Sequence, residues 1–252
     1  MGAEQLSFRL DPALPAAGPV APMWPVPRAD AFDSPDHLFE PTWGGHRVIA
    51  FVGPAELPGS GDVRLVDPTG LDLAPRLPEL SGLGVRVAAR SAVLDGELVV
   101  VDAAGRADDE ALRSRLNGGA GRSVALLVFD ILHLDGVWLL RTPLEKRRAT
   151  LRKALRPGDE VVVVPAIAAE GRALHDAVSA QGIAGVLARR RTSPYLPGVR
   201  SKLWRSIVAA KPGSAPAPAS DLSDAAIDGG ATAPVLALFR RLPFDEEPAL
   251  EE

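Results

Sequence analysis

The sequence predicts an α+β domain, in which strands and helices follow one another without a regular repeat. Strand-like apolar runs such as Ala125–Leu132 recur through the central part of the chain. Between them lie segments with helical spacing and capping residues, of which Thr142–Arg156 is the clearest. With 252 residues, 46% of them hydrophobic, the chain is long enough to bury a core.

The strand candidates are short segments rich in β-branched and apolar residues, bounded by turn-forming glycine and proline. In chain order they are His46–Val52, Asp62–Val66, Val85–Arg90, Ala92–Asp102, Ala125–Leu132, Glu160–Pro165, Ile183–Arg189 and Leu203–Val208. Side chains alternate between the two faces of a strand, so Leu94 and Leu98 share one face and Glu97 lies on the other. Glu97 is therefore expected on the polar side of a half-buried strand.

Three segments are expected to be helices: Asp108–Leu116, Thr142–Arg156 and Arg172–Ala180. The second has the fullest set of signals. Thr142 is the expected N-cap, Pro143 occupies the first helical position, and Glu145 follows three residues after the cap.

Composition divides the chain into three parts. Residues 1–28 are rich in proline and alanine, and an extended N-terminal arm is expected there. Residues 29–210 hold the predicted strands and helices. Residues 211–252 combine linker composition with an acidic tail and are expected to be largely disordered. Residues 212–252 carry eight acidic residues and two arginines, although the net charge of the whole chain is only −4.

Composition also excludes several kinds of chemistry and location. The chain has no cysteine, which rules out disulfides and thiolate metal sites, and its four histidines lack metal-ligand spacing. No stretch approaches the ~20 apolar residues of a membrane helix, and no signal peptide is evident. A cytoplasmic protein with no membrane partner is expected. Lysine is scarce, which limits the candidates for an amine nucleophile to Lys146, Lys153, Lys202 and Lys211.

Four segments, in order, resemble the adenylation domain of ATP-dependent DNA ligases, especially the bacterial end-joining type. They are Phe32–Val52, around TWGGHR; Val93–Arg106, with LDGELVVVD; Leu126–Leu151, with VFDIL; and Gly182–Val208, with TSPYLPGVRSKLW. The resemblance implies two antiparallel-rich sheets flanked by helices, which is the nucleotidyltransferase core of DNA ligases and mRNA capping enzymes (ATP-grasp-like). It also implies ATP and Mg²⁺ as cofactors and DNA as a partner. The family's C-terminal OB domain has no counterpart in the remaining residues, and none is expected.

The resemblance places the family's nucleophilic lysine at position 42, where this chain has Thr42. In the family, a lysine amine attacks the α-phosphate of ATP and carries the AMP group. A threonine hydroxyl is a far weaker nucleophile, and the sequence shows no adjacent base. The motif's aspartate is Gly44, the glutamate of a later motif is Ala184, and two lysines of the last strand are Ser206 and Val208. The sequence therefore predicts a catalytically silent pseudoenzyme.

Four nucleotide-contact positions of the family are retained. The resemblance implies that Glu40 accepts from the adenine amino group, Arg47 meets the ribose, and Glu97 binds ribose or metal. It also implies that Phe129 stacks on the base. Each residue has a structural alternative, since Phe129 suits the core and the charged residues suit a solvated surface. A vestigial nucleotide pocket is the hypothesis that the four together support.

Basic residues near the end of the predicted domain form the best candidate for a DNA surface. They are Arg189, Arg190, Arg191, Arg200, Lys202 and Arg205. Arg189 aligns with a family lysine. The alternative interpretation is a solvated cationic surface.

Three functional hypotheses remain open from the sequence. The first is a pseudo-ligase with a binding or regulatory role in DNA repair, acting on DNA or through a repair protein. The second is an active ATP-dependent ligase or nucleotidyltransferase with a displaced nucleophile such as Lys202. The third is a protein-interaction scaffold whose acidic tail, Phe244–Glu252, binds a basic partner.

Overall fold

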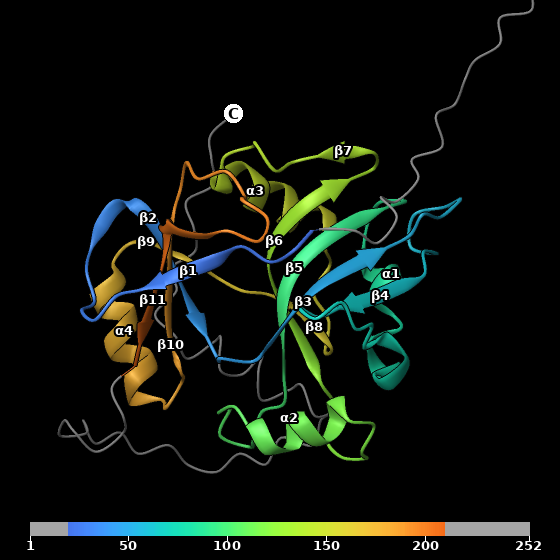
Figure 1. The fold of residues 1–252 in the computed structure, drawn as a ribbon, viewed down its shortest axis with the longest axis horizontal. Helices are drawn as coiled ribbons and strands as arrows, with labels where there is room; N and C mark the ends of the chain where they lie inside the picture. The colour runs from blue at the N-terminus through green and yellow to red at the C-terminus, as the bar shows by residue number, and fades with distance from the viewer. Residues whose placement is uncertain (1–19, 210–252) are drawn as a thin grey trace, which may run out of the picture.

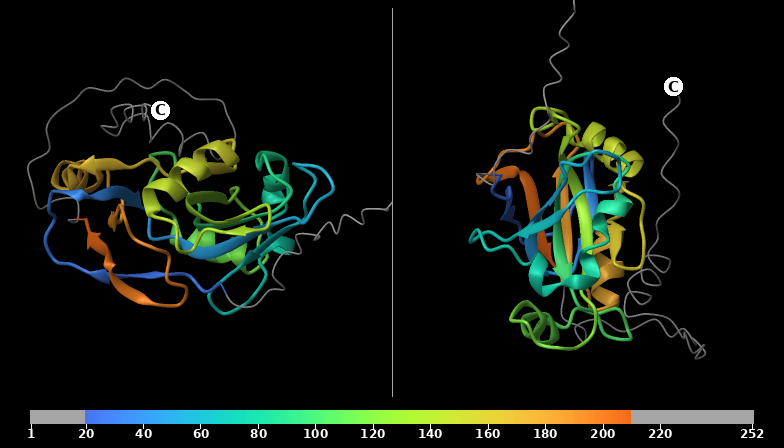
Figure 2. Two further views of the ribbon diagram at one scale, coloured as in Figure 1. Left: turned by 90° about the horizontal axis from the view of Figure 1, so that it is seen from above. Right: turned by 90° about the vertical axis from the view of Figure 1, so that its right-hand side faces the viewer.

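The structure, a computed structural model, describes residues 20–209. These residues form two β-sheets that lie side by side, with the helices around them (Figure 1). Turned views show the N-terminal segment β1 and the last strand β11 on one side and the helices α3 and α4 on the other (Figure 2). No helix within the described residues is long and apolar enough to cross a membrane.

The first sheet has five strands in the order β1-β11-β10-β2-β9. Their bounds are β1 Trp24–Pro27, β2 Ser34–Thr42, β9 Ile167–Ala169, β10 Gly185–Arg190 and β11 Arg200–Val208. All neighbours are antiparallel except β1 and β11, which pair in parallel at the sheet edge. The described part of the predicted arm is therefore extended, and it adds an edge strand to this sheet.

The second sheet follows the order β4-β3-β5-β6-β7, with β8 pairing in parallel to β6. Its strands are β3 His46–Val52, β4 Val63–Val66, β5 Ala92–Val99, β6 Ala125–Leu134, β7 Val137–Trp138 and β8 Val161–Val163. The two antiparallel-rich sheets expected from the resemblance are confirmed. All eight residues of β5 are buried, so the expectation that Glu97 lies on a half-exposed strand is wrong.

The helices are α1 Leu83–Arg86, α2 Asp109–Leu116, α3 Leu144–Ala154 and α4 Gly171–Ala180, with 3-10 turns at Ala74–Arg76 and Pro78–Leu80. The carboxylate of Asp108 caps α2 by accepting from the Ala111 N–H at 2.9 Å. Thr142 does not cap α3, contrary to the sequence prediction, because the helix begins at Leu144 and has no side-chain cap. The free N–H groups of Leu144 and Glu145 instead donate to carbonyls of the loop after β10.

Several elements differ from those predicted. The expected strand Val85–Arg90 overlaps the short helix α1, and only Val87 forms a β-bridge, to Leu155. The strands β1, β2, β7 and β9 were not predicted. In β2 the prolines at both ends of SPDHLFEPT resemble a loop sequence, yet the strand pairs with β10 from His37 to Thr42.

The described residues form four apolar clusters, and two of them position the pocket. The larger lies around the second sheet and includes Val48, Leu94, Leu126 and Leu151. Another joins the two sheets and includes Phe39 of β2 and Leu127 of β6. Because this second cluster contains residues from both sheets, it fixes the end of β2 beside β5 and β6, where the pocket described next is found.

Candidate functional site

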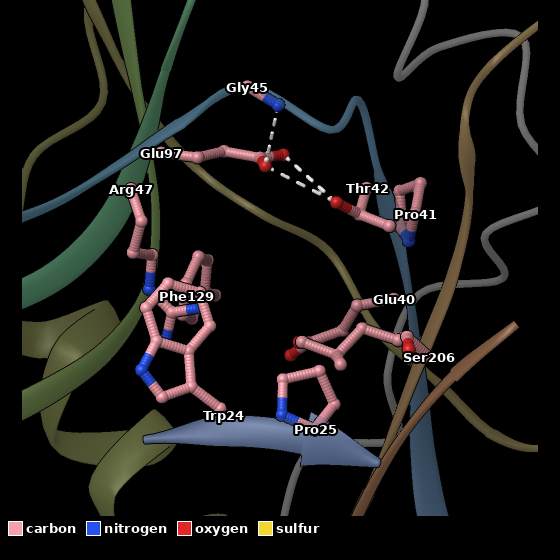
Figure 3. Close-up of a pocket in the computed structure, with 11 residues that line it drawn as sticks. Trp24, Pro25, Glu40, Pro41, Thr42, Gly45, Arg47, Glu97, Phe129 and Ser206 are labelled. Carbon is pink, nitrogen blue, oxygen red and sulfur yellow. Dashed lines mark hydrogen bonds between the residues drawn. The ribbon is translucent and has the colours of Figure 1, made fainter. Parts of the chain in front are cut away.

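A pocket lies where strands of the two sheets meet (Figure 3). It has a volume of about 170 Å³ and is lined by Trp24, Pro25, Glu40, Pro41, Thr42, Gly45, Arg47, Glu97, Phe129, Leu187 and Ser206. The four residues predicted from the sequence to contact a nucleotide thus come together in one pocket. Thr42, at the nucleophile position, lines the same pocket. That they bind a nucleotide stays a prediction.

Glu97 joins the turn between β2 and β3 to the second sheet. Its carboxylate accepts from the Thr42 hydroxyl at 3.2 Å, from the Trp43 N–H at 3.0 Å and from the Gly45 N–H at 3.1 Å. Burial raises the pKa of Glu97, although these donors and the nearby Arg47 act in the opposite direction. The sequence showed no base near Thr42, and the structure corrects this, because the Glu97 carboxylate lies beside that hydroxyl.

The turn itself is built around two glycines. Gly45 packs so closely on β5 that a Cβ there would lie 2.3 Å from the Leu98 carbonyl oxygen. Gly44 has φ +71°, and a Cβ built on it would lie 3.4 Å from the Cβ of Ala184. The resemblance expects a carboxylate at position 44 and another at position 184. The two lost acidic groups would therefore have been neighbours in space.

Residues 20–209 contain no preformed cluster of ligands for magnesium. Magnesium in proteins is bound through carboxylates and waters. Glu97 is the candidate ligand that the resemblance implied, but its oxygens already accept three hydrogen bonds. Within residues 20–209, no three acidic or histidine side chains gather closely enough to hold an ion.

Arg47 is held by a buried acid and does not point freely into the pocket. Its Nε and Nη2 donate to the two oxygens of Asp95 at 2.6 Å, and the Tyr195 hydroxyl donates to the same carboxylate at 2.6 Å. Burial disfavours the charge of Arg47, but Asp95 outweighs it and raises the Arg47 pKa. The Arg47 guanidinium also lies over the ring of Phe129, with 4.4 Å between its carbon and the ring centroid.

Glu40 belongs to a buried network of charges. Its Oε1 accepts from Arg148 and, at 2.5 Å, from Arg189. Arg189 also donates to Asp130 at 3.0 Å, and Arg147 donates to Asp130 twice at 2.8 Å. The Oε2 atom of Glu40 is buried and has no hydrogen-bond partner among the described residues.

The burial of Arg189 corrects one sequence prediction. Its side chain is 0% exposed, so it does not contact DNA phosphates from this position. The three consecutive arginines lie on a strand and the loop after it, and side chains of a strand alternate between faces. Arg190 is consequently exposed, and Arg191 forms a half-exposed ion pair with Glu145 at 3.2 Å.

The other predicted DNA contacts lie on or near the surface. Arg200 and Lys202 are exposed, and Arg205 is half-buried. Burial lowers the pKa of His37, and the charges of Arg190, Arg205 and Arg28 lower it further, while the charge of Asp36 opposes them. Arg28, which lies directly after β1, was missed because no motif contains it.

The two sheets, with a pocket between strands that carry the four motifs, define the core of a nucleotidyltransferase. Residues 31–207 match the family model of the ATP-dependent DNA ligase domain, and the chain belongs to that family. The multifunctional end-joining DNA repair protein LigD of Mycobacterium tuberculosis is 32% identical over 166 residues, which is 66% of this chain and 21% of LigD. A probable DNA ligase of Rhodococcus opacus is 34% identical over 150 residues, covering 58% of this chain and 30% of that protein.

Solved structures agree with this assignment. A mycobacterial DNA ligase D complexed with ATP superimposes with a TM-score of 0.63 and 30% identity, covering 75% of this chain and 60% of that one. The ligase domain of M. tuberculosis LigD gives a TM-score of 0.62 and 31% identity, covering 74% and 58%. The chain spans about a fifth of the curated LigD proteins that it matches.

Proposed function

We propose that this chain is a catalytically silent ligase-like protein that retains a binding or regulatory role in DNA repair. The observation that carries the proposal is the pocket at position 42. Thr42 is among its lining residues, and no lysine is. Adenylyl transfer in this family requires an amine, and the lining offers hydroxyls and carboxylates in its place.

The surroundings of Thr42 support the same conclusion. Phosphoryl transfer depends on cations that neutralise charge developing on the phosphate oxygens. Ser206 lines the pocket where the resemblance expects a lysine, and Val208, at the second such position, is 79% exposed and outside the lining. Arg47, the one cation in the lining, is already bound to Asp95.

A displaced lysine finds little support within the described residues. Lys202 is exposed on β11 and is not among the lining residues, while Lys146 and Lys153 lie on α3. Lys211 and the acidic segment Phe244–Glu252 lie outside the described residues. The displaced-nucleophile and scaffold hypotheses therefore remain alternatives without a structural observation in their favour.

The decisive experiment is incubation with ATP labelled at the α-phosphate, with Mg²⁺ or Mn²⁺, followed by denaturing electrophoresis. We expect no labelled band, while a ligase with an intact motif lysine serves as the positive control. Thr42→Lys is also expected to remain unlabelled, because the other lost groups are still missing. A labelled wild-type chain would overturn the proposal, and strong labelling of Thr42→Lys would show that the rest of the catalytic site is intact.

A DNA-binding role would use the exposed cations of the first sheet. Arg28 and Arg190 are exposed and Arg205 is half-buried, and the charges of all three act on His37. Replacing Arg190 and Arg205 by alanine is expected to weaken DNA binding and to reduce its salt dependence by about one unit of slope for each lost phosphate contact. Unchanged affinity and an unchanged salt slope would exclude DNA binding by this surface from the proposed role.

A further inference from the structure

We infer that the pocket takes a nucleoside without phosphate, and that it rejects nucleoside triphosphates because the Glu97 carboxylate already occupies its anion-binding donors. The inference rests on the proposed silent pocket and names the chemical class of its ligand. Its main supports are the bonding of Glu97, the charge of the lining, and the aromatic wall formed by Trp24.

The turn after β2 has the groups that a phosphate would need. The Thr42 hydroxyl and the N–H groups of Trp43 and Gly45 all point to one place, as donors do in backbone sites for anions. In this structure all three donate to the carboxylate of Glu97. A phosphate in the same place would have to displace this carboxylate and lie next to its charge, in a buried setting where like charges repel strongly.

The remaining charges do not offset that repulsion. The ionisable residues in the lining are Glu40, Arg47 and Glu97. Arg47 is neutralised by Asp95, and the Oε1 of Glu40 is held by two arginines that are not part of the lining. Ser206, where a cation would serve a phosphate, is neutral. No positive group in the lining is thus left to pair with a phosphate, and the negative charge of three phosphates would not be neutralised there.

The other part of the pocket suits an uncharged, planar group. Trp24 of β1 is half-buried and lines the pocket. The ring of Phe129 is less available, because the guanidinium carbons of Arg47 and Arg189 lie 4.4 and 5.2 Å from its centroid, whereas the Arg47 carbon lies 5.7 Å from the Trp24 ring. Figure 3 shows Trp24 and Phe129 on the same side of the pocket, next to Arg47. Trp24 is therefore the ring that we expect to stack on a base.

Two further features fit a small ligand with an amino group. The Oε2 atom of Glu40 is buried without a partner among the described residues, and it can accept one hydrogen bond from an exocyclic amino group, as in adenine. The pocket volume of about 170 Å³ also lies below the about 300–1,000 Å³ common for small-molecule sites. Both observations favour a nucleoside over a nucleoside triphosphate.

The test compares adenosine, AMP and ATP with Mg²⁺ as ligands of the purified full chain by isothermal titration calorimetry. We expect adenosine to bind at least ten times more tightly than AMP or ATP. ATP binding as tight as adenosine binding would overturn the inference, and so would the absence of adenosine binding. Calorimetry measures binding, whereas the proposed silent function is tested by covalent labelling. Failure of the inference can therefore be distinguished from failure of the proposed function.

Two variants test the role assigned to Glu97 and to the missing cation. Glu97→Gln removes the internal anion and is expected to strengthen AMP binding at least fivefold while adenosine binding changes less than threefold. Ser206→Lys is expected to have the same effect and leaves the bonds of Glu97 in place. Val137→Lys, at a 59% exposed position on β7 outside the lining, is the control and should change neither affinity. Equal effects of the two lysine variants would refute the charge argument.

A third variant tests the aromatic wall. Trp24→Ala is expected to weaken adenosine binding at least about fivefold, since stacking of a base on an aromatic ring has that lower limit. Trp138→Ala is the control, because Trp138 is 39% exposed on β7 and is absent from the lining. Adenosine affinity that is the same in both variants would exclude Trp24 as the stacking residue.

Discussion

Glu40 and Arg189 were both expected from the sequence to contact ligands, and the structure predicts unequal effects when each is replaced. Together with Asp130, Arg147 and Arg148 they form a buried cluster of three guanidinium groups and two carboxylates. Glu40→Gln leaves the three positive groups with one carboxylate. Arg189→Met leaves two positive and two negative groups, and each of these keeps an ion-pair partner.

Removing one partner from a buried ion pair costs about 3–5 kcal/mol, because the remaining charge stays buried without compensation. Glu40→Gln is therefore expected to lower the unfolding free energy by about 3–5 kcal/mol, which is about 6–20 °C in Tm for a domain of this size. Arg189→Met is expected to cost less than about 2 kcal/mol, because methionine fills the space and no charge is left alone. Arg189 Nε is also a buried donor with no partner among the described residues, and the substitution removes it.

Urea denaturation followed by circular dichroism measures both values, and the m-value should remain unchanged. Glu145→Gln is the control, since its ion pair with Arg191 is 40% exposed on each side and is worth at most about 1 kcal/mol. If Arg189→Met proves as destabilising as Glu40→Gln, the surplus of positive charge is not what governs the stability of this cluster.

Two further predictions concern the turn after β2. Because burial raises the pKa of Glu97 above its usual 4.5, folded Glu97 keeps a proton over a pH window in which the unfolded chain has already lost it. Stability therefore falls as pH rises from 4.5 through the folded-state pKa, and above that window Glu97 is a carboxylate in both states. Glu97→Gln should remove this contribution, and denaturation curves at several pH values should show a less negative slope of stability against pH in the variant; equal slopes would contradict it. Gly45→Ala should destabilise the fold by more than about 2 kcal/mol, because its methyl group would meet the Leu98 carbonyl oxygen at 2.3 Å. Gly70 differs in having a positive φ of +90°, but a Cβ there would meet nothing within 4 Å, so Gly70→Ala should cost only about 1 kcal/mol of backbone strain. A thermal melt that ranks the two variants in reverse would exclude the steric argument.

The sequence predicted the elements whose signals are local. The strand His46–Val52 matches β3 residue for residue, and Asp108–Leu116 needs only its first residue reassigned as the cap of α2. Their apolar patterns and turn residues lie within the segments themselves. The order of the four motifs also placed four pocket residues correctly relative to one another, because the fold of the family brings those motifs together.

Long-range contacts account for most of what the sequence did not show. The edge strand β1 forms because it pairs with β11, about 175 residues further along the chain. The segment WPVP contains no local signal that predicts this pairing. Trp24 was missed as a pocket residue for the same reason. Arg189 was partly predictable, since its segment was already expected to be a strand and alternation separates it from Arg190. The buried acids that hold it come from β2 and β6.

The geometry at Glu97 also explains why a restored lysine is expected to stay inactive. A lysine attacks phosphorus only as the neutral amine, so its pKa must be lowered, and neighbouring cations do this in active amine nucleophiles. At position 42 a lysine would lie where the Thr42 hydroxyl now meets the Glu97 carboxylate. An adjacent carboxylate favours the ammonium form and raises the lysine pKa. With Ser206 neutral and Arg47 bound to Asp95, no lining cation opposes that shift. The loss of the lysine and the loss of its supporting charges thus reinforce each other, and reversing the first alone would leave an ion pair in place of a nucleophile.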